Sequence, residues 1–308
     1  MGQMTPILMD VDTGVDDALA LMLAVSEPDV DLVAVTCCAG NVGAGQAVTN
    51  TLAVLELCGA HEVAVAMGSE APLVVPLRTA TSHGPHGLGF ATPPPPRGMV
   101  SDRFGPELIV DLARQHEGEL VLVATGPLTN IALALRYEPA LPRLLGRLAL
   151  MGGSFDHPGN TTPAAEFNIW VDPEAAAAVF NAFSVADRRP LVVGLNVTDD
   201  AQLTPGHLTA LGGGEIADFV AAALRVKFED KGFARMHDPV ALALAVDPAF
   251  GATRAGTVDV ELGGALTRAM TVVDWHGLWG RPPNADVAVS VDYDRFLDRL
   301  VERLVALS

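Results

Sequence analysis

Short apolar runs alternate with helix-length segments along most of this sequence, and this alternation constrains the fold more than any other feature. An apolar run at residues 6–9 is followed by a turn and by apolar residues at helical spacing over residues 16–26. Repeated strand–helix units of this kind place parallel strands in one sheet with helices on its faces. The pattern therefore predicts an α/β fold with a Rossmann-like, mostly parallel central sheet. The other strand-like runs lie at residues 31–37, 62–68, 119–125, 147–153 and 190–196.

Two segments interrupt this alternation. Residues 69–104 and 154–172 are rich in proline, glycine and turn-forming residues, and we expect irregular structure in both. A loop as long as the first is usually functional. After the run at 190–196 we expect helix to about Val246. No linker or internal repeat divides the chain, so residues 1–308 are predicted to form one domain. Three half-exposed strands and a closing amphipathic helix are expected at residues 257–262, 271–275, 286–292 and 293–307.

Composition excludes several classes of partner. The formal net charge of -18 repels nucleic acid and anionic lipid at long range, so neither is an expected partner. The three cysteines, Cys37, Cys38 and Cys58, fit neither a disulfide framework nor a metal-binding spacing, which favours a reducing compartment. The start of the chain lacks a signal-peptide pattern, and no apolar run approaches the ~18 residues that a membrane helix needs. A cytoplasmic protein is predicted.

Four aspartates lie within eight positions of the first strand–turn–helix unit: Asp10, Asp12, Asp16 and Asp17. The last two have an ordinary explanation, because acids at a helix start cap the helix and complement its dipole. That explanation does not cover Asp10 and Asp12. Carboxylates this close repel one another unless a cation lies among them, and hard cations such as Ca²⁺ and Mg²⁺ take oxygen ligands. The cluster therefore predicts a metal site.

The predicted sheet brings polar groups from distant parts of the sequence to the same edge. In an open α/β sheet the ligand binds beyond the carboxyl ends of the strands. Asn41, Thr125 and Met151 each lie at or just past the carboxyl end of a different predicted strand. We therefore expect them to line one site together with the aspartates.

Two known acidic motifs can be compared with this stretch. An EF-hand loop starting at Asp10 would need glycine and glutamate where the sequence has Val15 and Leu21, so it is excluded. The stretch "DVDTG" fits the D-x-D opening of haloacid-dehalogenase-like phosphatases. Those enzymes also need a later lysine and an acidic pair, and the only lysines here are Lys227 and Lys231. That match ends after one motif.

A longer match covers essentially the whole chain. The stretch "DVDTGVDDALAL" resembles the D-x-D-x-G-x-D-D-A signature of the inosine-uridine-preferring nucleoside hydrolase family. Further segments agree with the family in the same order. They are "AGN" ending at Asn41, "HGPHGLG" from His83, "ATGPLTNIALAL" from Ala124, "MGG" at Met151, "GNTTPAAEFNIWVDPEAA" from Gly159, "MHDPVALA" from Met236, and "RPPNADVAVSVD" from Arg281.

The resemblance implies a doubly wound α/β fold and hydrolysis of the N-glycosidic bond of ribonucleosides to ribose and free base. Departure of the base leaves an oxocarbenium-like sugar, so such a site stabilises positive charge and supplies a nucleophilic water. In the family's pattern Asp16 is the general base beside a metal-bound water, with Asp10 behind the metal ligands. The Ca²⁺ ligands implied are the carboxylates of Asp12, Asp17 and Asp238 and the main-chain carbonyl of Thr125.

The resemblance also implies which residues hold the ribose hydroxyls. Glu166 and Asn168 are two positions apart, which would place both on the same side of an extended segment. Phe167, between them, is expected to point into the core. The full set implied for the sugar is Asn41, the Met151 main chain, Asn160, Glu166 and Asn168.

On the base side the resemblance implies His83 and His237. His237 is a candidate acid for the leaving base, because an imidazole titrates close to neutrality. His86 replaces the small residue usual in the family and has no expected role. Two histidines favour a base-nonspecific or pyrimidine-leaning enzyme over the purine-specific branch, which relies on tryptophan stacking. Trp275 and Trp279 are expected to pack against the core.

The last expectations concern nucleotide substrates, alternative functions and the oligomeric state. The matched motifs contain many carboxylates and no nearby lysine or arginine, which predicts that nucleotides are poor substrates. The same scaffold could instead bind a nucleoside or ribose without hydrolysing it, and Asp16 separates the two interpretations, because a binding protein needs no base. A phosphatase is the third alternative. Family members are usually dimers or tetramers, so a homodimer or homotetramer is implied.

Overall fold

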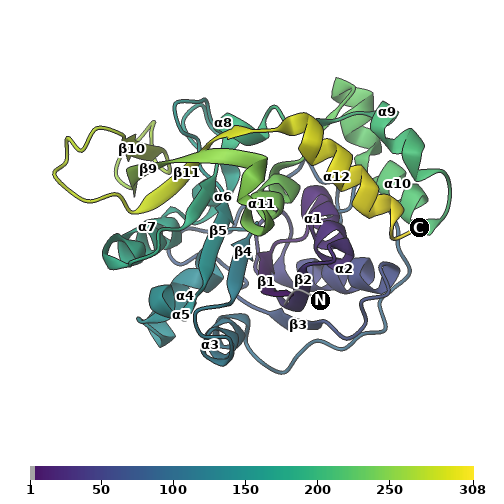
Figure 1. The fold of residues 1–308 in the computed structure, drawn as a ribbon, viewed down its shortest axis with the longest axis horizontal. Coiled ribbons are helices and arrows are strands. Elements are labelled where there is room, and N and C mark those ends of the chain that lie inside the picture. Colours follow the sequence, from purple (N-terminus) through teal and green to yellow (C-terminus); the bar gives the residue numbers. More distant parts are fainter. Residues whose placement is uncertain (1–3) are drawn as a thin grey trace.

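The computed structural model describes residues 4–308. A nine-stranded sheet runs through its centre, and helices lie on both of its faces (Figure 1). The predicted α/β class with one central sheet is confirmed. The strands of this sheet are β1 (Thr5–Val11), β2 (Val30–Cys37), β3 (Ala64–Met67), β4 (Val121–Ala124), β5 (Arg147–Met151), β6 (Leu191–Val193), β9 (Gly251–Val260), β10 (Thr271–Asp274) and β11 (Ala285–Val291).

The strand order is β10-β9-β11-β6-β5-β4-β1-β2-β3. All neighbours from β3 through to β11 pair in parallel, whereas β9 is antiparallel to both β11 and β10. The chain builds β1, β2 and β3 toward one edge and then returns to place β4 on the other side of β1. A ligand crevice forms beyond the strand ends where the direction of winding changes, and here that point lies between β1 and β4.

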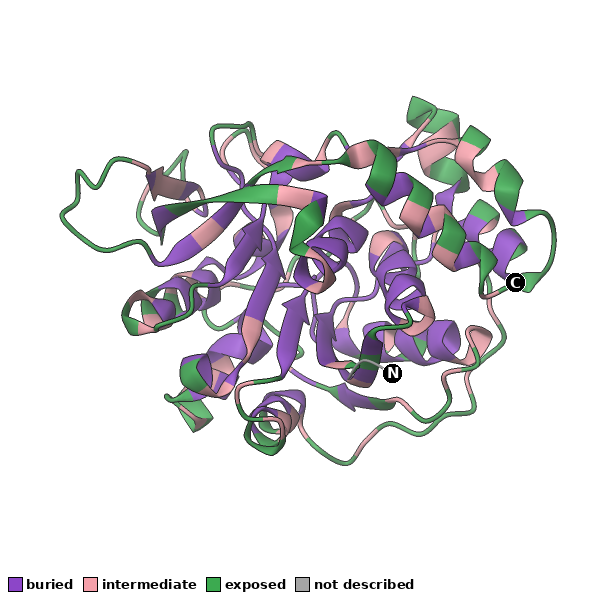
Figure 2. Ribbon diagram, viewed as in Figure 1, coloured by how far each residue is buried: buried purple, intermediate pink, exposed green. Residues whose placement is uncertain are grey.

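Each face of the sheet has its own hydrophobic core. Along β1, Ile7 and Met9 belong to one core and Leu8 to the other, as the alternation of side chains in a strand requires. The residues of the central strands are mostly buried on both faces, whereas β9 is largely exposed over its first half (Figure 2). The helices on the Ile7 face are α1 (Val15–Ser26), α2 (Ala44–Leu57), α10 (Glu215–Lys231), α11 (His237–Val246) and α12 (Tyr293–Val305). Those on the Leu8 face are α3 (Gly105–Gln115), α4 (Thr129–Tyr137) and α7 (Pro173–Ala182).

Residues 68–104 contain no helix or strand beyond an isolated bridge at Ser101, as the sequence predicts. The segment is nevertheless fixed to α10, because the Phe90 N–H donates to the Ala222 carbonyl at 3.2 Å and the Arg225 guanidinium lies 5.0 Å from the centre of the Phe90 ring. A long loop and a helix thus form one wall above the strand ends.

Two expectations about regular structure are wrong. The segment 154–172 contains a short helix, α6 (Phe167–Val171). The region expected to be helical to Val246 contains an antiparallel pair, β7 (Gln202–Leu203) and β8 (Ala234–Arg235). These two strands are separated by a long helix, so no local periodicity reveals their pairing. The remaining short helices are α5 (Leu141–Leu144), α8 (Leu195–Thr198) and α9 (Pro205–Leu208), with 3-10 turns at Phe183–Val185, Thr209–Leu211 and Pro248–Phe250.

All three cysteines are free thiols. Cys37 and Cys38 are fully buried at the end of β2, and burial raises the pKa of both thiols. Burial also raises the pKa of Cys58 to about 12. None is a reactive thiolate at neutral pH. Among residues 4–308, no helix combines the length and the apolar character needed to cross a bilayer.

Candidate active site

A cavity of about 240 Å³ opens beyond the carboxyl ends of the central strands, where the topology predicts a ligand. Residues that follow β1, β2, β4 and β5 meet there with the start of α11 and the last turns of α10. The predicted site residues in its lining are Asp16, Asn41, His83, Thr125, Met151, Asn160, Glu166, Asn168, His237 and Asp238. The other two, Asp12 and Asp17, are fully buried and bonded to lining residues.

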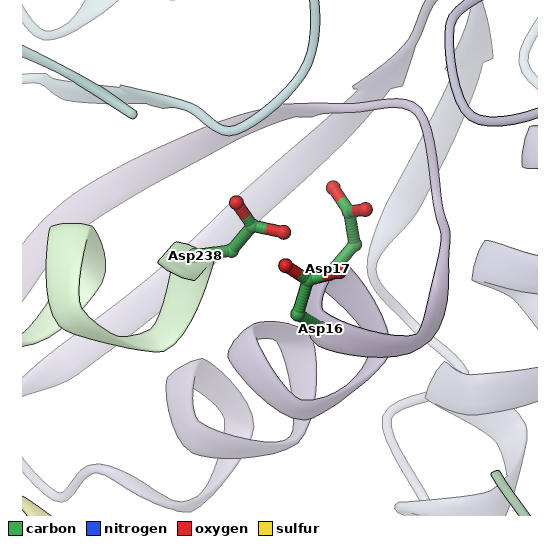
Figure 3. Close-up of side chains that lie close together, drawn as sticks. All are labelled: Asp16, Asp17 and Asp238. Carbon is green, nitrogen blue, oxygen red and sulfur yellow. The ribbon is translucent and has the colours of Figure 1, made fainter. Parts of the chain in front are cut away.

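Three carboxylates converge at the floor of this cavity. One oxygen from each of Asp16, Asp17 and Asp238 lies within 4.8 Å of the others (Figure 3). Asp16 and Asp17 lie in the first turn of α1 and Asp238 in the first turn of α11, two helices that pack together. Both helix N-termini favour negative charge there. Yet the only basic group of residues 4–308 within 4.0 Å of these carboxylates is His83, whose Nδ1 lies 3.7 Å from Asp16.

This acidic floor fits a hard divalent cation. Burial first, and then the negative charges of neighbouring aspartates, raise the pKa of Asp12, Asp17 and Asp238. No side-chain or backbone donor of residues 4–308 hydrogen-bonds to the carboxylates of Asp16 and Asp238. Uncompensated carboxylates in a buried cluster are costly, and an oxygen-liganded cation would remove that cost.

Asn41 and Thr125 hold the two buried carboxylates in place. The Asn41 N–H donates to Asp12 Oδ2 at 2.6 Å, and its side-chain amide donates to both Asp12 and Asp17. Thr125 Oγ1 donates to Asp17 Oδ1 at 2.7 Å. A Cβ on Gly40 would lie 2.1 Å from Asp12 Oδ2, which explains the glycine of the "AGN" segment.

The sequence predicts that the first apolar run ends at residue 9 and is followed by a turn, but β1 continues through Val11 and includes Asp10, so that predicted strand end is wrong. Asp10 Oδ1 accepts hydrogen bonds from Thr36 Oγ1 at 2.5 Å and Asn130 Nδ2 at 2.7 Å, and Asp10 Oδ2 has no partner. Burial raises the pKa of this carboxyl to about 7. Asp10 does not line the cavity. It joins β1 to β2 and to α4 behind the acidic floor.

Glu166 and Asn168 reach the cavity by a different local structure from the extended segment expected. Glu166 caps α6, and its carboxylate accepts from the backbone N–H groups of Asn168, Ile169 and Gly153 at 2.8–3.1 Å. Asn168 Nδ2 donates to the Thr125 carbonyl at 2.7 Å. Phe167 is half-buried and lines the cavity, so its expected place in the core is wrong. In a helix turn, neighbours i and i+2 do not share a face, but a capping side chain folds back over its own turn.

Glu166 also makes the stability of the metal-free protein depend on pH. Burial raises the pKa of its carboxyl from 4.5 to about 7, against the opposing effect of its backbone donors. The contribution of the Glu166 carboxyl to the free energy of unfolding is therefore at its maximum below pH 4.5. It is lost as the pH rises through about 7, which lowers the free energy of unfolding by about 3 kcal/mol. Urea unfolding at pH 5 and pH 8, with chelator present, should show a smaller pH difference for Glu166→Gln than for the native protein. An unchanged difference would contradict this assignment.

The two predicted base-side histidines are neutral in the free protein. His83 Nδ1 accepts from the Val15 N–H at 3.0 Å, which places the ring proton on Nε2, and His237 Nδ1 bonds the Thr198 hydroxyl at 2.7 Å. Burial lowers the pKa of each to about 4. The premise that His237 titrates near neutrality is therefore wrong for the free protein. His86 is exposed and contributes its main-chain carbonyl to Asn50.

The tryptophans lie outside the cavity lining. Trp275 packs against the core on the Leu8 face, as expected, and its Nε1 donates to Asp156 at 2.9 Å. Trp279 is 42% exposed beneath the Arg281 guanidinium, so its expected place in the core is wrong.

The sequence reasoning missed several residues of the cavity. Lys227, Lys231 and Arg235 line it, so the premise that no lysine or arginine lies nearby is wrong. The signal was present, because the only two lysines stand four positions apart on the helix that precedes "MHDP". Phe233 is a further lining residue that the motifs did not indicate.

A doubly wound α/β sheet with an acidic, amide-lined cavity at its winding reversal defines a class of protein that binds small polar ligands at the strand ends. The model of the inosine-uridine preferring nucleoside hydrolase family matches residues 7–298. The chain belongs to this family. It is a nucleoside hydrolase, an enzyme of the N-glycosidase class, and the phosphatase interpretation is set aside.

Known relatives cover the chain almost completely. An inosine-uridine preferring nucleoside hydrolase from Leishmania major is 38% identical over 97% of this chain and 96% of its own. The pyrimidine-specific ribonucleoside hydrolase RihA from Enterobacter sp. is 40% identical over 98% of each. The structure of a purine-preferring ribonucleoside hydrolase from Gardnerella vaginalis superposes with a TM-score of 0.91, at 32% identity and 98% coverage of each chain. These names differ in base preference, so membership of the family does not set it.

Proposed function

We propose that this protein is a Ca²⁺-dependent ribonucleoside hydrolase in which Asp16 is the general base. The observation that carries the proposal is the convergence of Asp16, Asp17 and Asp238 on one cavity, without a lysine or arginine partner in residues 4–308. A homodimer or homotetramer in the cytoplasm remains the expected form of the enzyme.

The residues that would hold Ca²⁺ are Asp12, Asp17, Asp238 and the Thr125 carbonyl. When bound, the cation would lower the pKa of a coordinated water and so make it a better nucleophile. The donors are all oxygens, and no lysine or arginine of residues 4–308 pairs with their carboxylates, which suits a hard cation of this kind.

The chain's own residues would carry the remaining steps. Asp16 lines the cavity beside the ligand carboxylates, where it can accept the proton of the attacking water. The acidic floor favours the positive charge that develops on the sugar as the glycosidic bond breaks. Asn160, Glu166 and Asn168 lie on the neighbouring wall, and their polar groups would orient the ribose hydroxyls.

We expect a base-nonspecific or pyrimidine-leaning enzyme. Two histidines line the cavity, whereas no tryptophan of residues 4–308 does, so the site lacks the indole stacking surface on which the purine-specific branch relies. Values of kcat/KM should be measured for inosine, uridine, cytidine and adenosine by base release. Uridine should equal or exceed inosine, whereas purine selectivity of about 100-fold, equivalent to about 2.7 kcal/mol, would overturn the preference.

A further inference from the structure

The two lysines of this chain both lie at the active-site cavity. Lys227 and Lys231 are four residues apart near the end of α10, so they share one helix face. Lys227 is half-buried and Lys231 exposed. Neither ammonium has a carboxylate within 4.0 Å or a hydrogen-bond partner among residues 4–308, although the chain carries 37 acids. A half-buried, unpaired ammonium on a cavity wall is available to a ligand.

Lys227 lines the same cavity as His83 and His237, the residues that the family pattern places beside the base. Its positive charge contributes to lowering the pKa of both His83 and His237. Burial lowers the pKa of Lys227 itself, and the negative charge of Asp16 opposes that effect. The cavity therefore has negative charge at its carboxylate floor and positive charge on the α10 wall.

This polarity matches the charge separation of the proposed reaction. Breaking the glycosidic bond leaves its electron pair on the base nitrogen and positive charge on the sugar. Fixed charges that match those of a transition state, in a site shielded from water, lower its free energy. The acidic floor would act on the sugar, and a cation on the α10 wall would act on the base.

We infer that Lys227 is a catalytic residue that donates a hydrogen bond to the departing base and stabilises its negative charge. This inference rests on the proposed ribonucleoside hydrolysis. The water oxygen bonds to the sugar carbon, the proton of that water passes to Asp16, and the base leaves as an anion bonded to Lys227. The base takes a proton from solvent on release, Asp16 returns the proton of the water to solvent, and Lys227 keeps its own. Lys231, one turn farther out, adds a weaker field.

The test compares two leaving groups in the Ca²⁺-loaded enzyme. Lys227→Met should lower kcat/KM for uridine about 100-fold, as loss of a preorganised donor does elsewhere. It should lower kcat/KM for 4-nitrophenyl riboside less than about 5-fold, because 4-nitrophenolate stabilises its own negative charge. Lys227→Arg should restore most of the loss. Arg136→Met, an exposed cation on the opposite face of the sheet, controls for net charge.

The outcomes separate this inference from the proposed function. Equal losses of kcat/KM for uridine and 4-nitrophenyl riboside would show that Lys227 has a structural role and would contradict the inference. Lys227→Gln should repeat the result of Lys227→Met, and melting curves of both variants show whether they are folded. If uridine 5'-monophosphate is cleaved faster than uridine and Lys227→Met removes that advantage, the lysines hold a phosphate instead and the inference is wrong. If the native enzyme releases base and Lys227→Met is fully active, this inference is wrong and the proposed function stands. If the native protein releases no base, both the inference and the proposed function are wrong.

Discussion

Asp16→Asn should lower kcat for nucleoside hydrolysis by about 1,000-fold or more while leaving affinity for a ribose-like inhibitor within a few-fold. Asparagine keeps the size of the side chain but cannot accept the proton of the attacking water. Asp16 lines the cavity and accepts no hydrogen bond from residues 4–308, so the isosteric substitution breaks no hydrogen bond of the described protein. Single-turnover base release and inhibitor titration measure the two quantities separately.

Asp31→Asn provides the matched control, because Asp31 is exposed at the start of β2, at the opposite end of the strand from the cavity, and does not line it. It should behave like the native protein in both assays. Retention of more than a tenth of the native kcat by Asp16→Asn would remove Asp16 from the role of base. If the native protein binds the inhibitor but releases no base from any nucleoside, the non-catalytic binding interpretation holds instead.

Removal of divalent cation should abolish activity and destabilise the fold. Asp12, Asp17 and Asp238 are almost fully buried and repel one another, so the metal-free protein carries an electrostatic cost that Ca²⁺ would relieve. Calcium at about 100 times its Kd should raise the free energy of unfolding by about 2.7 kcal/mol. Thermal melting and base release, each with chelator, Ca²⁺ or Mg²⁺, measure both effects.

Asp238→Asn tests the same metal dependence at one of the proposed ligands. It removes one charged ligand, so both the calcium-dependent gain in Tm and the activity should largely disappear, whereas Asp31→Asn should keep them. Full activity after exhaustive chelation, with no cation found by elemental analysis, would eliminate the metal from the proposal. If Mg²⁺ raised the Tm and the activity more than Ca²⁺ does, the proposed ion would be wrong but the metal site would stand.

Much of the fold could be predicted from the sequence, because the central strands are apolar runs between amphipathic helices. Burial on both faces of a parallel sheet produces such runs, and they lie close to the observed β1, β2, β4 and β5. The pairing of β7 with β8 could not be predicted, because it depends on two short segments brought together by the packing of α10. The cap that Glu166 makes on α6 was also hidden, since a two-residue spacing fits a strand equally well.

The active site likewise combines features that could be predicted from the sequence with features that depend on residues distant in the sequence. The order of acids and amides along the sequence indicated the cavity, because the strand ends of a parallel sheet share one edge. That Asn130 bonds Asp10, that Phe167 faces the cavity, and that burial holds the pKa of His237 at about 4 depend on neighbours distant in sequence.

The sequence by itself determined the alternation of strands and helices, the acidic cluster and the family signature, because each is written in residues close together along the chain. Only the tertiary structure decided that α10 carries both lysines to a cavity floored by carboxylates from α1 and α11. Charge acts through space, so the polarity of this site arises only once distant segments have packed together.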